Sequence, residues 1–288
     1  MRPTVVFALQ SPTLLNVLAK SKRWQLEVAD LGDHPGQESA LLEAPAYRGG
    51  PVDHVFVCSP EHWRRAREQF PRARLWWLVH NGLPGIIPAD IQPERAVALS
   101  RRVAGLQLLV RPDLPILVVT PAYEPRRVWS WAPGAWTMVS RPATRHPEHL
   151  HNVERVRALA DVDHELYGEG EPGGFLYPED REKKQSACSA YLSALPRWSG
   201  FGLAEHECLA AGVPVVGSRW GDMPEEMPEE YVGLVDAPSV QAAVLRSLAD
   251  PVHGPALGRT LSEIGLAFIA GHRRLEQMEE GIQEVIDS

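Results

Sequence analysis

The chain has few cysteines, and their spacing is not that of a metal-binding or redox pair. Cys58, Cys188 and Cys208 are an odd number of thiols, far apart among 288 residues. Structural zinc sites and disulfide frameworks need closely spaced or paired cysteines. We therefore expect ordinary buried thiols, with neither a disulfide scaffold nor a zinc site.

Long hydrophobic runs are also lacking. No segment approaches the roughly 18 apolar residues that span a bilayer, and residues 5–9 are too short for the core of a signal peptide. A hydrophobic content of 44% with 23% charged residues is typical of globular proteins. The sequence contains no repeat of fixed period, and its length fits two domains. These features predict a cytoplasmic two-domain protein.

Charge is unevenly distributed along the chain. Residues 1–134 hold 16 Lys and Arg against 12 Asp and Glu, whereas residues 135–288 hold 13 against 25, which together give the net charge of −8. Within the first half, five arginines stand close to three tryptophans: Arg64, Arg65, Arg67, Arg72 and Arg74, with Trp63, Trp76 and Trp77. This segment is either a basic, aromatic surface for an anionic partner or membrane face, or a solvated helix face over core tryptophans.

Short apolar runs alternate with helical stretches, which predicts an α/β fold with buried parallel strands. In the first half the predicted strands are 4–9, 25–31, 54–58, 75–80, 96–100 and 116–120, with helices over 12–20 and 61–70. In the second half they are 136–140, 165–168, 174–177, 191–195 and 213–217, with helices over 147–160, 179–190 and 203–211. The Pro- and Trp-rich residues 121–135 are the predicted linker, and one amphipathic helix is expected over about 256–286. The simplest architecture is two doubly wound Rossmann-like domains facing across a cleft.

Residues 199–214, SGFGLAEHECLAAGVP, are the most informative segment. Gly200 and Gly202 allow a backbone to approach a ligand closely, and a helix over 203–211 then ends at Gly212. The helix N-terminus and the preceding amides favour an anion such as phosphate.

Glu207 shares one helical face with Leu203, His206 and Ala210, so it is predicted to point inward. An unpaired buried carboxylate costs several kcal/mol, so either a cation or a ligand with hydroxyl donors should contact it. Glu205 falls on the opposite side of the helical wheel and is predicted to face solvent.

Two arginines precede the predicted helix 147–160. Arg141 follows the strand 136–140, and Arg145 stands four residues later, where both could hold a diphosphate. The alternative for either residue is a surface ion pair.

In this order of elements, residues 136–226 closely resemble the donor domain of the retaining family 4 glycosyltransferases, which have the GT-B fold. The resemblance rests on the strand followed by Arg141, on Tyr167-Gly168-Glu169-Gly170, on Ser199-Gly200-Phe201-Gly202-Leu203 with Glu207, and on residues 210–216 and 218–225. Over residues 1–130 it is only architectural, because Gln10-Ser11-Pro12 replaces the family's glycine-rich first loop.

The resemblance implies a nucleotide-sugar donor, UDP-sugar first and GDP-sugar as the alternative, with no further cofactor. In the family's Glu-x7-Glu motif the second acid, matched by Glu207, binds the ribose. The place of the first acid, which contacts the donor sugar, is taken by Ser199, and this loses a hydrogen bond worth roughly 1.5–3 kcal/mol. The implied donor contacts are Arg141, Arg145, Tyr177, Ser199, Gly200, Phe201, Gly202, Leu203 and Glu207.

Catalysis by such an enzyme would retain the anomeric configuration, with the leaving diphosphate helping to take the acceptor proton. The resemblance implies that His80, which follows the strand 75–80, lies close to the reacting sugar, with Arg141 as its catalytic partner; the alternative for His80 is a histidine that satisfies a turn. No Asp-x-Asp arrangement is supported by other metal-ligand spacing, so no metal is expected.

The resemblance implies a short acceptor domain over 1–125, a donor domain over 126–265 and a helix over 266–288 that packs back on the first domain. The acceptor is unknown, and a lipid-linked acceptor or a hydroxylated nucleic-acid base would suit a basic segment, which also allows association with the inner membrane face. Two other functions stay open: a catalytically silent GT-B nucleotide-binding or scaffold protein, and a nucleotide-sugar epimerase. The oligomeric state is not predicted.

Overall fold

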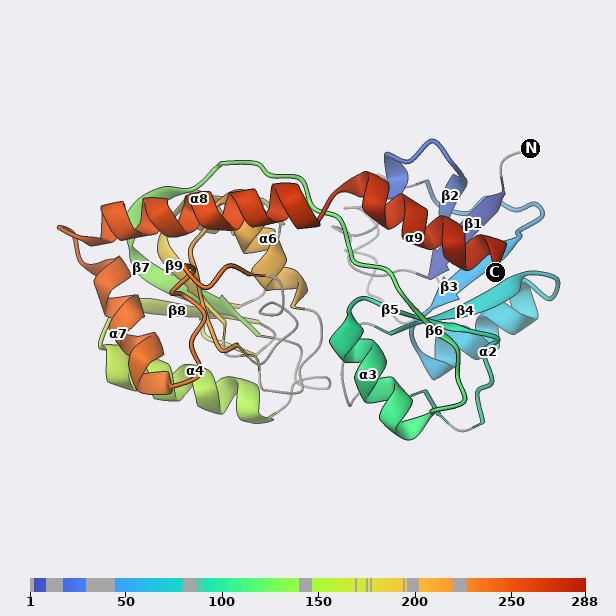
Figure 1. Cartoon of the computed structure of the whole chain (residues 1–288), viewed down its shortest axis with the longest axis horizontal. Helices are drawn as coiled ribbons and strands as arrows, with labels where there is room; N and C mark the ends of the chain where they lie inside the picture. The colour runs from blue at the N-terminus through green and yellow to red at the C-terminus, as the bar shows by residue number, and fades with distance from the viewer. Residues whose placement is uncertain are drawn as a thin grey trace. The chain divides into compact units, whose positions relative to one another are not determined.

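The chain forms two compact units, each built on its own parallel sheet. The computed structural model describes residues 3–8, 18–29, 45–79, 87–88, 90–139, 147–168, 170–174, 176, 178–193, 195, 202–219 and 227–288. Unit 1 comprises Met1–Tyr123 with Arg273–Ser288, and unit 2 comprises Glu124–His272 (Figure 1).

Unit 1 contains a six-stranded sheet in the order β2-β1-β3-β4-β5-β6, in which every pair of neighbours is parallel. Its strands are β1 (Thr4–Ala8), β2 (Gln25–Ala29), β3 (His54–Val57), β4 (Arg74–Val79), β5 (Ala96–Ala98) and β6 (Ile116–Val118). Its helices are α2 (Pro60–Gln69), α3 (Arg101–Val110) and α9 (Leu275–Asp287). All six predicted strands are confirmed to within two residues at each end.

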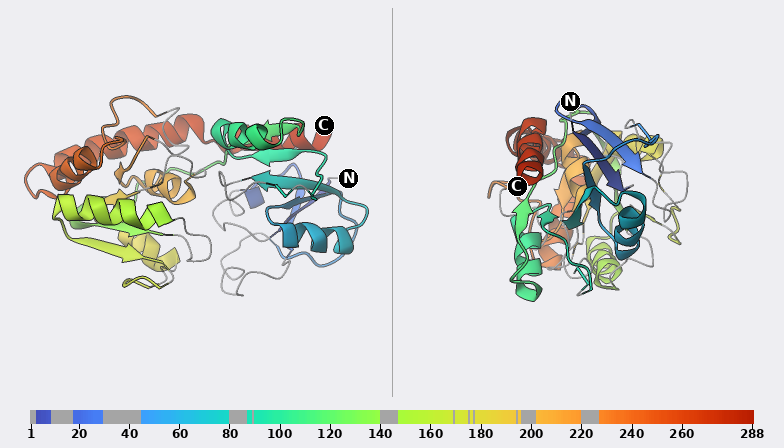
Figure 2. Two further views of the ribbon diagram at one scale, coloured as in Figure 1. Left: turned by 90° about the horizontal axis from the view of Figure 1, so that it is seen from below. Right: turned by 90° about the vertical axis from the view of Figure 1, so that its right-hand side faces the viewer.

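Side chains alternate across the strands of unit 1, as a sheet covered on both faces requires. Val55, Val57 and Trp77 pack with Trp63 of α2 in one core cluster. Figure 2 shows α2 and α9 on opposite sides of these strands.

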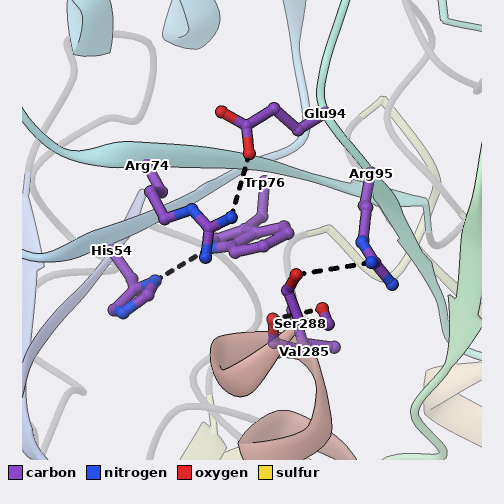
Figure 3. A network of polar contacts seen from close by, with 7 residues as sticks. All are labelled: His54, Arg74, Trp76, Glu94, Arg95, Val285 and Ser288. Carbon is purple, nitrogen blue, oxygen red and sulfur yellow. Dashed lines mark hydrogen bonds and ion pairs between the residues drawn. The ribbon is translucent and has the colours of Figure 1, made fainter.

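The basic segment of unit 1 is a charged surface over core tryptophans, which is the second of the two readings above. Trp63, Trp76 and Trp77 are 8%, 0% and 2% exposed, so none of them offers an aromatic surface. Trp76 Nε1 donates to His54 Nδ1 at 3.1 Å, and Arg74 lies over the Trp76 ring while pairing with Glu94 at 3.2 Å (Figure 3). The reason is the apolar sequence of β4, RLWWLV, which forms a central strand buried on both faces.

Unit 2 contains a four-stranded parallel sheet in the order β10-β9-β7-β8. Its strands are β7 (Ser130–Met138), β8 (His164–Tyr167), β9 (Ala187–Leu192) and β10 (Val215–Val216). Its helices are α4 (Pro147–Ala160), α5 (Pro178–Ser186), α6 (Leu203–Ala211), α7 (Pro238–Ala249) and α8 (Gly254–His272). In Figure 1, α4 packs with α7 below the strands, and α6 packs with α8 above them. The bounds predicted for α4 and α6 are confirmed.

The predicted linker over 121–135 is wrong in its second part, because β7 already begins at Ser130. Its pairing with β9 is irregular between Trp131 and Ala135, where Pro133 offers no N–H and Gly134 has φ 96°. Trp131 anchors the strand by donating from Nε1 to the Leu248 carbonyl at 2.8 Å. Long-range contacts therefore override the turn-forming composition.

Three other predicted elements differ from the structure. The helix predicted over 179–190 ends at Ser186, because residues from Ala187 onward pair with β7 in parallel. Among residues 174–177, the two that the structure describes, 174 and 176, belong to no strand. The single C-terminal helix is two helices, α8 and α9, since the Arg273 carbonyl between them accepts the Tyr123 N–H at 2.9 Å.

Candidate functional site

The candidate site of unit 2 lies where the connections of its sheet change direction. After β7 the chain continues to β8 on one side, and after β9 it continues to β10 on the other. The carboxyl ends of β7 and β9 are neighbours in the sheet, and open α/β sheets bind ligands at such a switch point. The segments that begin at Val139 and at Ser193 leave the sheet there.

The N-terminus of α6 is fixed at this edge by Gly202. The residue has φ 74° and ψ 60°, a left-handed backbone conformation that residues other than glycine rarely adopt. A Cβ at this position would lie 2.9 Å from Glu205 Oε2 and 3.1 Å from Leu195 Cδ1. The chain therefore enters α6 through a turn that requires glycine, and the positive end of the helix dipole lies at the carboxyl edge.

Glu207 is buried on α6, as its position on the helical wheel predicts. Its side chain is 7% exposed, and its Oε2 lies 2.8 Å from Nη1 of Arg181 on α5. Of the two partners that the sequence allows for this carboxylate, the structure supplies the cation. A carboxylate has about four lone-pair positions, so this ion pair is compatible with a ligand hydroxyl on the same group.

Glu205 is the clearest error of the sequence reasoning, because it is buried and not solvent-facing. It is 4% exposed, and its Oε1 accepts a hydrogen bond from the Ser193 hydroxyl, directly after β9. Burial raises the pKa of Glu205; the Ser193 bond acts in the opposite direction, and the Glu207 carboxylate adds to the rise. The helical wheel failed because every residue of α6 from Glu205 to Ala211 is buried, so this helix has no solvent face.

His206 also helps to hold the first turn of α6, a role that its spacing did not predict. Its Nδ1 lies 2.9 Å from the Gly202 carbonyl, and because a carbonyl only accepts, Nδ1 carries the proton. The ring packs against Phe268 of α8, with 6.3 Å between centroids. The turn at Gly202 is thus held by the His206 imidazole, while the Glu205 carboxyl group bonds the chain directly after β9.

Of the predicted donor-site residues, the structure places Gly202, Leu203 and Glu207, and it brings them together with Arg181 and Glu205. The others lie outside the described residues: His80, Arg141, Arg145, Tyr177, Ser199, Gly200 and Phe201. Arg181 was missed because its acidic partner is 26 residues away in the sequence.

Within the described part of the chain, no three His, Cys, Asp or Glu residues are grouped to hold a metal ion, and no helix is long and apolar enough to cross a membrane.

The C-terminus of α6 gives a prediction for stability. Gly212 has φ 84°, and a Cβ there would lie 2.9 Å from Ser262 Oγ on α8. Replacing Gly212 by alanine is expected to lower the free energy of unfolding by about 1–3 kcal/mol, because the left-handed backbone and the close contact both oppose a side chain. The measurement is urea unfolding. Gly271→Ala in α8 is the matched control: nothing lies within 4 Å of its Cβ position, and equal losses in both variants would contradict this account.

Two parallel, doubly wound α/β units of this kind define the fold of the GT-B glycosyltransferases. Among solved structures, HepE from Anabaena in complex with UDP-glucose matches with a TM-score of 0.72 and 14% identity, over 99% of this chain and 100% of that one. A glycosyltransferase from Rickettsia africae matches with a TM-score of 0.68 and 14% identity, over 99% and 98% of the two chains. For the sucrose-phosphate synthase of Thermosynechococcus elongatus the TM-score is 0.64 at 14% identity, over 99% and 98%.

No protein-family profile and no curated protein matches the sequence. At 14% identity the structural likeness establishes the fold and leaves the activity to be argued from the site.

Proposed function

We propose that this protein is a glycosyltransferase that uses a UDP-sugar, with GDP-sugar as the alternative donor. The observation that carries the proposal is Glu207. It is a buried carboxylate on the helix that follows the sequence SGFG, at the switch point of the sheet in unit 2. The complex of HepE with UDP-glucose, in the same fold, supports a nucleotide-sugar as the ligand.

In the proposed donor complex, Glu207 accepts hydrogen bonds from the ribose hydroxyls, and the diphosphate lies against the amides of Gly200 and Leu203. Arg141 and Arg145 supply positive charge to the diphosphate, and the base lies near Tyr177. The α6 dipole points its positive end toward the same group. Ser199 faces the donor sugar with a hydroxyl where the resembling family has a carboxylate. Unit 2 is then the donor domain, and unit 1 carries the acceptor.

The proposed reaction retains the anomeric configuration. The bond from the anomeric carbon to the diphosphate oxygen breaks, a bond to the acceptor oxygen forms on the same face, and the acceptor proton passes to the leaving diphosphate. Arg141 stabilises the negative charge that develops on that diphosphate, and His80 lies beside the reacting sugar. No step requires a metal ion.

The test is a thermal-shift panel of UDP, GDP, ADP and their sugars with the whole chain. A ligand at about 100 times its Kd adds roughly 2.7 kcal/mol of stability, so a true donor raises Tm measurably. Glu207→Gln is expected to show a much smaller shift at the same ligand concentration, whereas Glu182→Gln, an exposed acid of α5, is expected to keep the full shift. If no nucleotide shifts Tm, or if Glu207→Gln responds like the wild type, the donor-site assignment is wrong.

Release of free nucleotide from the bound donor separates the enzyme from a silent nucleotide-binding protein. Ser199 favours the silent alternative, because it removes an expected contact with the sugar. Nucleotide binding with neither donor hydrolysis nor transfer to any acceptor would support that alternative. Conversion of the donor into a different nucleotide-sugar, with no acceptor consumed, would instead identify an epimerase.

A further inference from the structure

Arg181 is a basic residue of α5 that lies at the candidate site and has no role in the donor complex described above. Its side chain is 23% exposed, which is low for an arginine, and its Nη1 lies 2.8 Å from Glu207 Oε2. A guanidinium removed from water to this extent needs an anionic partner. The ion pair joins α5 to α6, two helices that are neighbours on one side of the sheet.

Glu207 and its neighbour Glu205 differ in the groups that hold them. Glu205 and Glu207 are both buried near the start of α6, and the Glu207 carboxylate contributes to raising the pKa of Glu205. Arg181 pairs with Glu207, whereas Glu205 accepts a hydrogen bond from the neutral hydroxyl of Ser193. Arg181 therefore acts on the Glu207 carboxylate, and Glu205 is held by a separate contact.

The position of α5 connects this ion pair to the nucleoside. The helix begins at Pro178, directly after Tyr177, the residue proposed to lie near the base. Arg181 follows in its first turn. The base and the ribose are adjacent parts of one ligand. In the proposed complex, Tyr177 therefore lies near the base while Arg181, four residues later, holds the carboxylate that binds the ribose.

We propose that Arg181 is a positioning residue that holds the Glu207 carboxylate in the orientation in which it accepts hydrogen bonds from the ribose hydroxyls of the donor nucleotide. This inference rests on the proposed function, because it assumes that Glu207 binds the ribose. Arg181 itself touches neither the sugar nor the reacting atoms. Its effect passes through the Glu207 carboxylate.

The test compares the binding of UDP and 2′,3′-dideoxy-UDP to the whole chain by calorimetry. The ratio of the two Kd values reports the contacts to the ribose hydroxyls and is insensitive to changes in overall affinity. The wild type is expected to prefer UDP by about 10- to 100-fold, the range for hydrogen bonds to a charged group. Arg181→Met is expected to reduce this preference to about threefold or less, and Arg181→Lys to give an intermediate value because it restores a charge without the planar fork.

A control and a double variant sharpen the result. Arg126 contacts the same helix, with Nη1 3.6 Å from Glu182 and Nη2 3.0 Å from Gln185 Oε1, so Arg126→Met should keep the wild-type preference. Glu207→Gln should lose the preference, and adding Arg181→Met to it should cause little further loss, because both residues act through one carboxylate.

The outcomes separate this inference from the proposed function. Failure of the wild type to bind UDP overturns the UDP-donor proposal, and this inference falls with it. Equal binding of UDP and its dideoxy analogue by the wild type refutes the ribose role of Glu207. A wild type that discriminates, together with Arg181 variants that discriminate equally well, overturns the positioning role alone. If Arg181→Met does not fold, Arg181→Lys decides, and a wild-type ratio there also overturns it.

Discussion

Truncating Glu207 to alanine is expected to lower the free energy of unfolding by about 3–5 kcal/mol, the loss that follows when one partner of a buried ion pair is removed. Arg181, which is 23% exposed in the intact pair, would face a cavity with its Glu207 partner gone. Few single substitutions in this chain should cost as much, since surface changes usually stay within about 0.5 kcal/mol. Urea unfolding of the wild type and the variant measures the difference.

The matched variants separate charge from volume. Glu182→Ala removes the acid of an exposed pair, whose side chains are 43% and 57% exposed, and should cost under about 1 kcal/mol. The double variant Arg181→Met with Glu207→Leu should recover much of the stability, because it removes both charges and keeps the volume. It should still lack the preference for UDP over 2′,3′-dideoxy-UDP. A loss below about 1 kcal/mol for Glu207→Ala would show that the ion pair is effectively solvated.

The second large effect is a loss of stability in acid, caused by His164. This residue begins β8 and is 8% exposed, and its Nε2 lies 2.8 Å from Thr137 Oγ1. The Thr137 hydroxyl donates to the Leu192 carbonyl at 2.6 Å, so Nε2 must be the donor to Thr137. Nδ1 is buried without a hydrogen-bond partner among the described residues. Among the described residues, a second proton on this ring therefore finds no acceptor with good hydrogen-bond geometry.

Burial, with the charge of Arg157 adding to it, lowers the pKa of His164 to about 4 from 6.5. Above pH 6.5 the ring is neutral in both the folded and the unfolded chain, so it does not affect stability. Between pH 6.5 and about 4 only the unfolded chain takes up the proton, and stability falls as the pH falls. The full loss is on the order of 3 kcal/mol, from about 2.5 units of pKa at 1.36 kcal/mol each.

His164→Gln tests this pH dependence, since its amide can still donate to Thr137 and has no proton to gain. Urea unfolding from pH 7.5 to 4.5 should show that the stability of the wild type falls more steeply than that of the variant. His54, whose pKa burial also lowers, is present in both proteins and cancels in the comparison. Parallel pH profiles for the two proteins would refute the assignment to His164.

Much of the fold was predictable because it depends on local patterns. The buried strands of unit 1 are continuous apolar runs, and the predicted α6 ends at Gly212 because left-handed backbone there requires glycine. The α5–β9 boundary was not predictable in the same way. Residues 187–190, ACSA, contain two alanines, which favour a helix locally, but pairing of Ala187 with Ser130, far away in sequence, made them part of a strand.

In the candidate site, too, the features that depend on neighbouring residues were predictable and those that depend on distant residues were not. By itself the sequence determined the glycine turn into α6, the helix that follows, and the inward direction of Glu207, since each depends on residues within one or two turns. Only the tertiary structure decided that Arg181 is the partner of Glu207 and that Glu205 is buried on Ser193. The physical reason is that a helical wheel gives the direction of a side chain relative to its own helix axis. Whether the side chain contacts water, an arginine or a hydroxyl depends on which distant elements pack around the helix. In α6, all residues from Glu205 to Ala211 are buried by such elements.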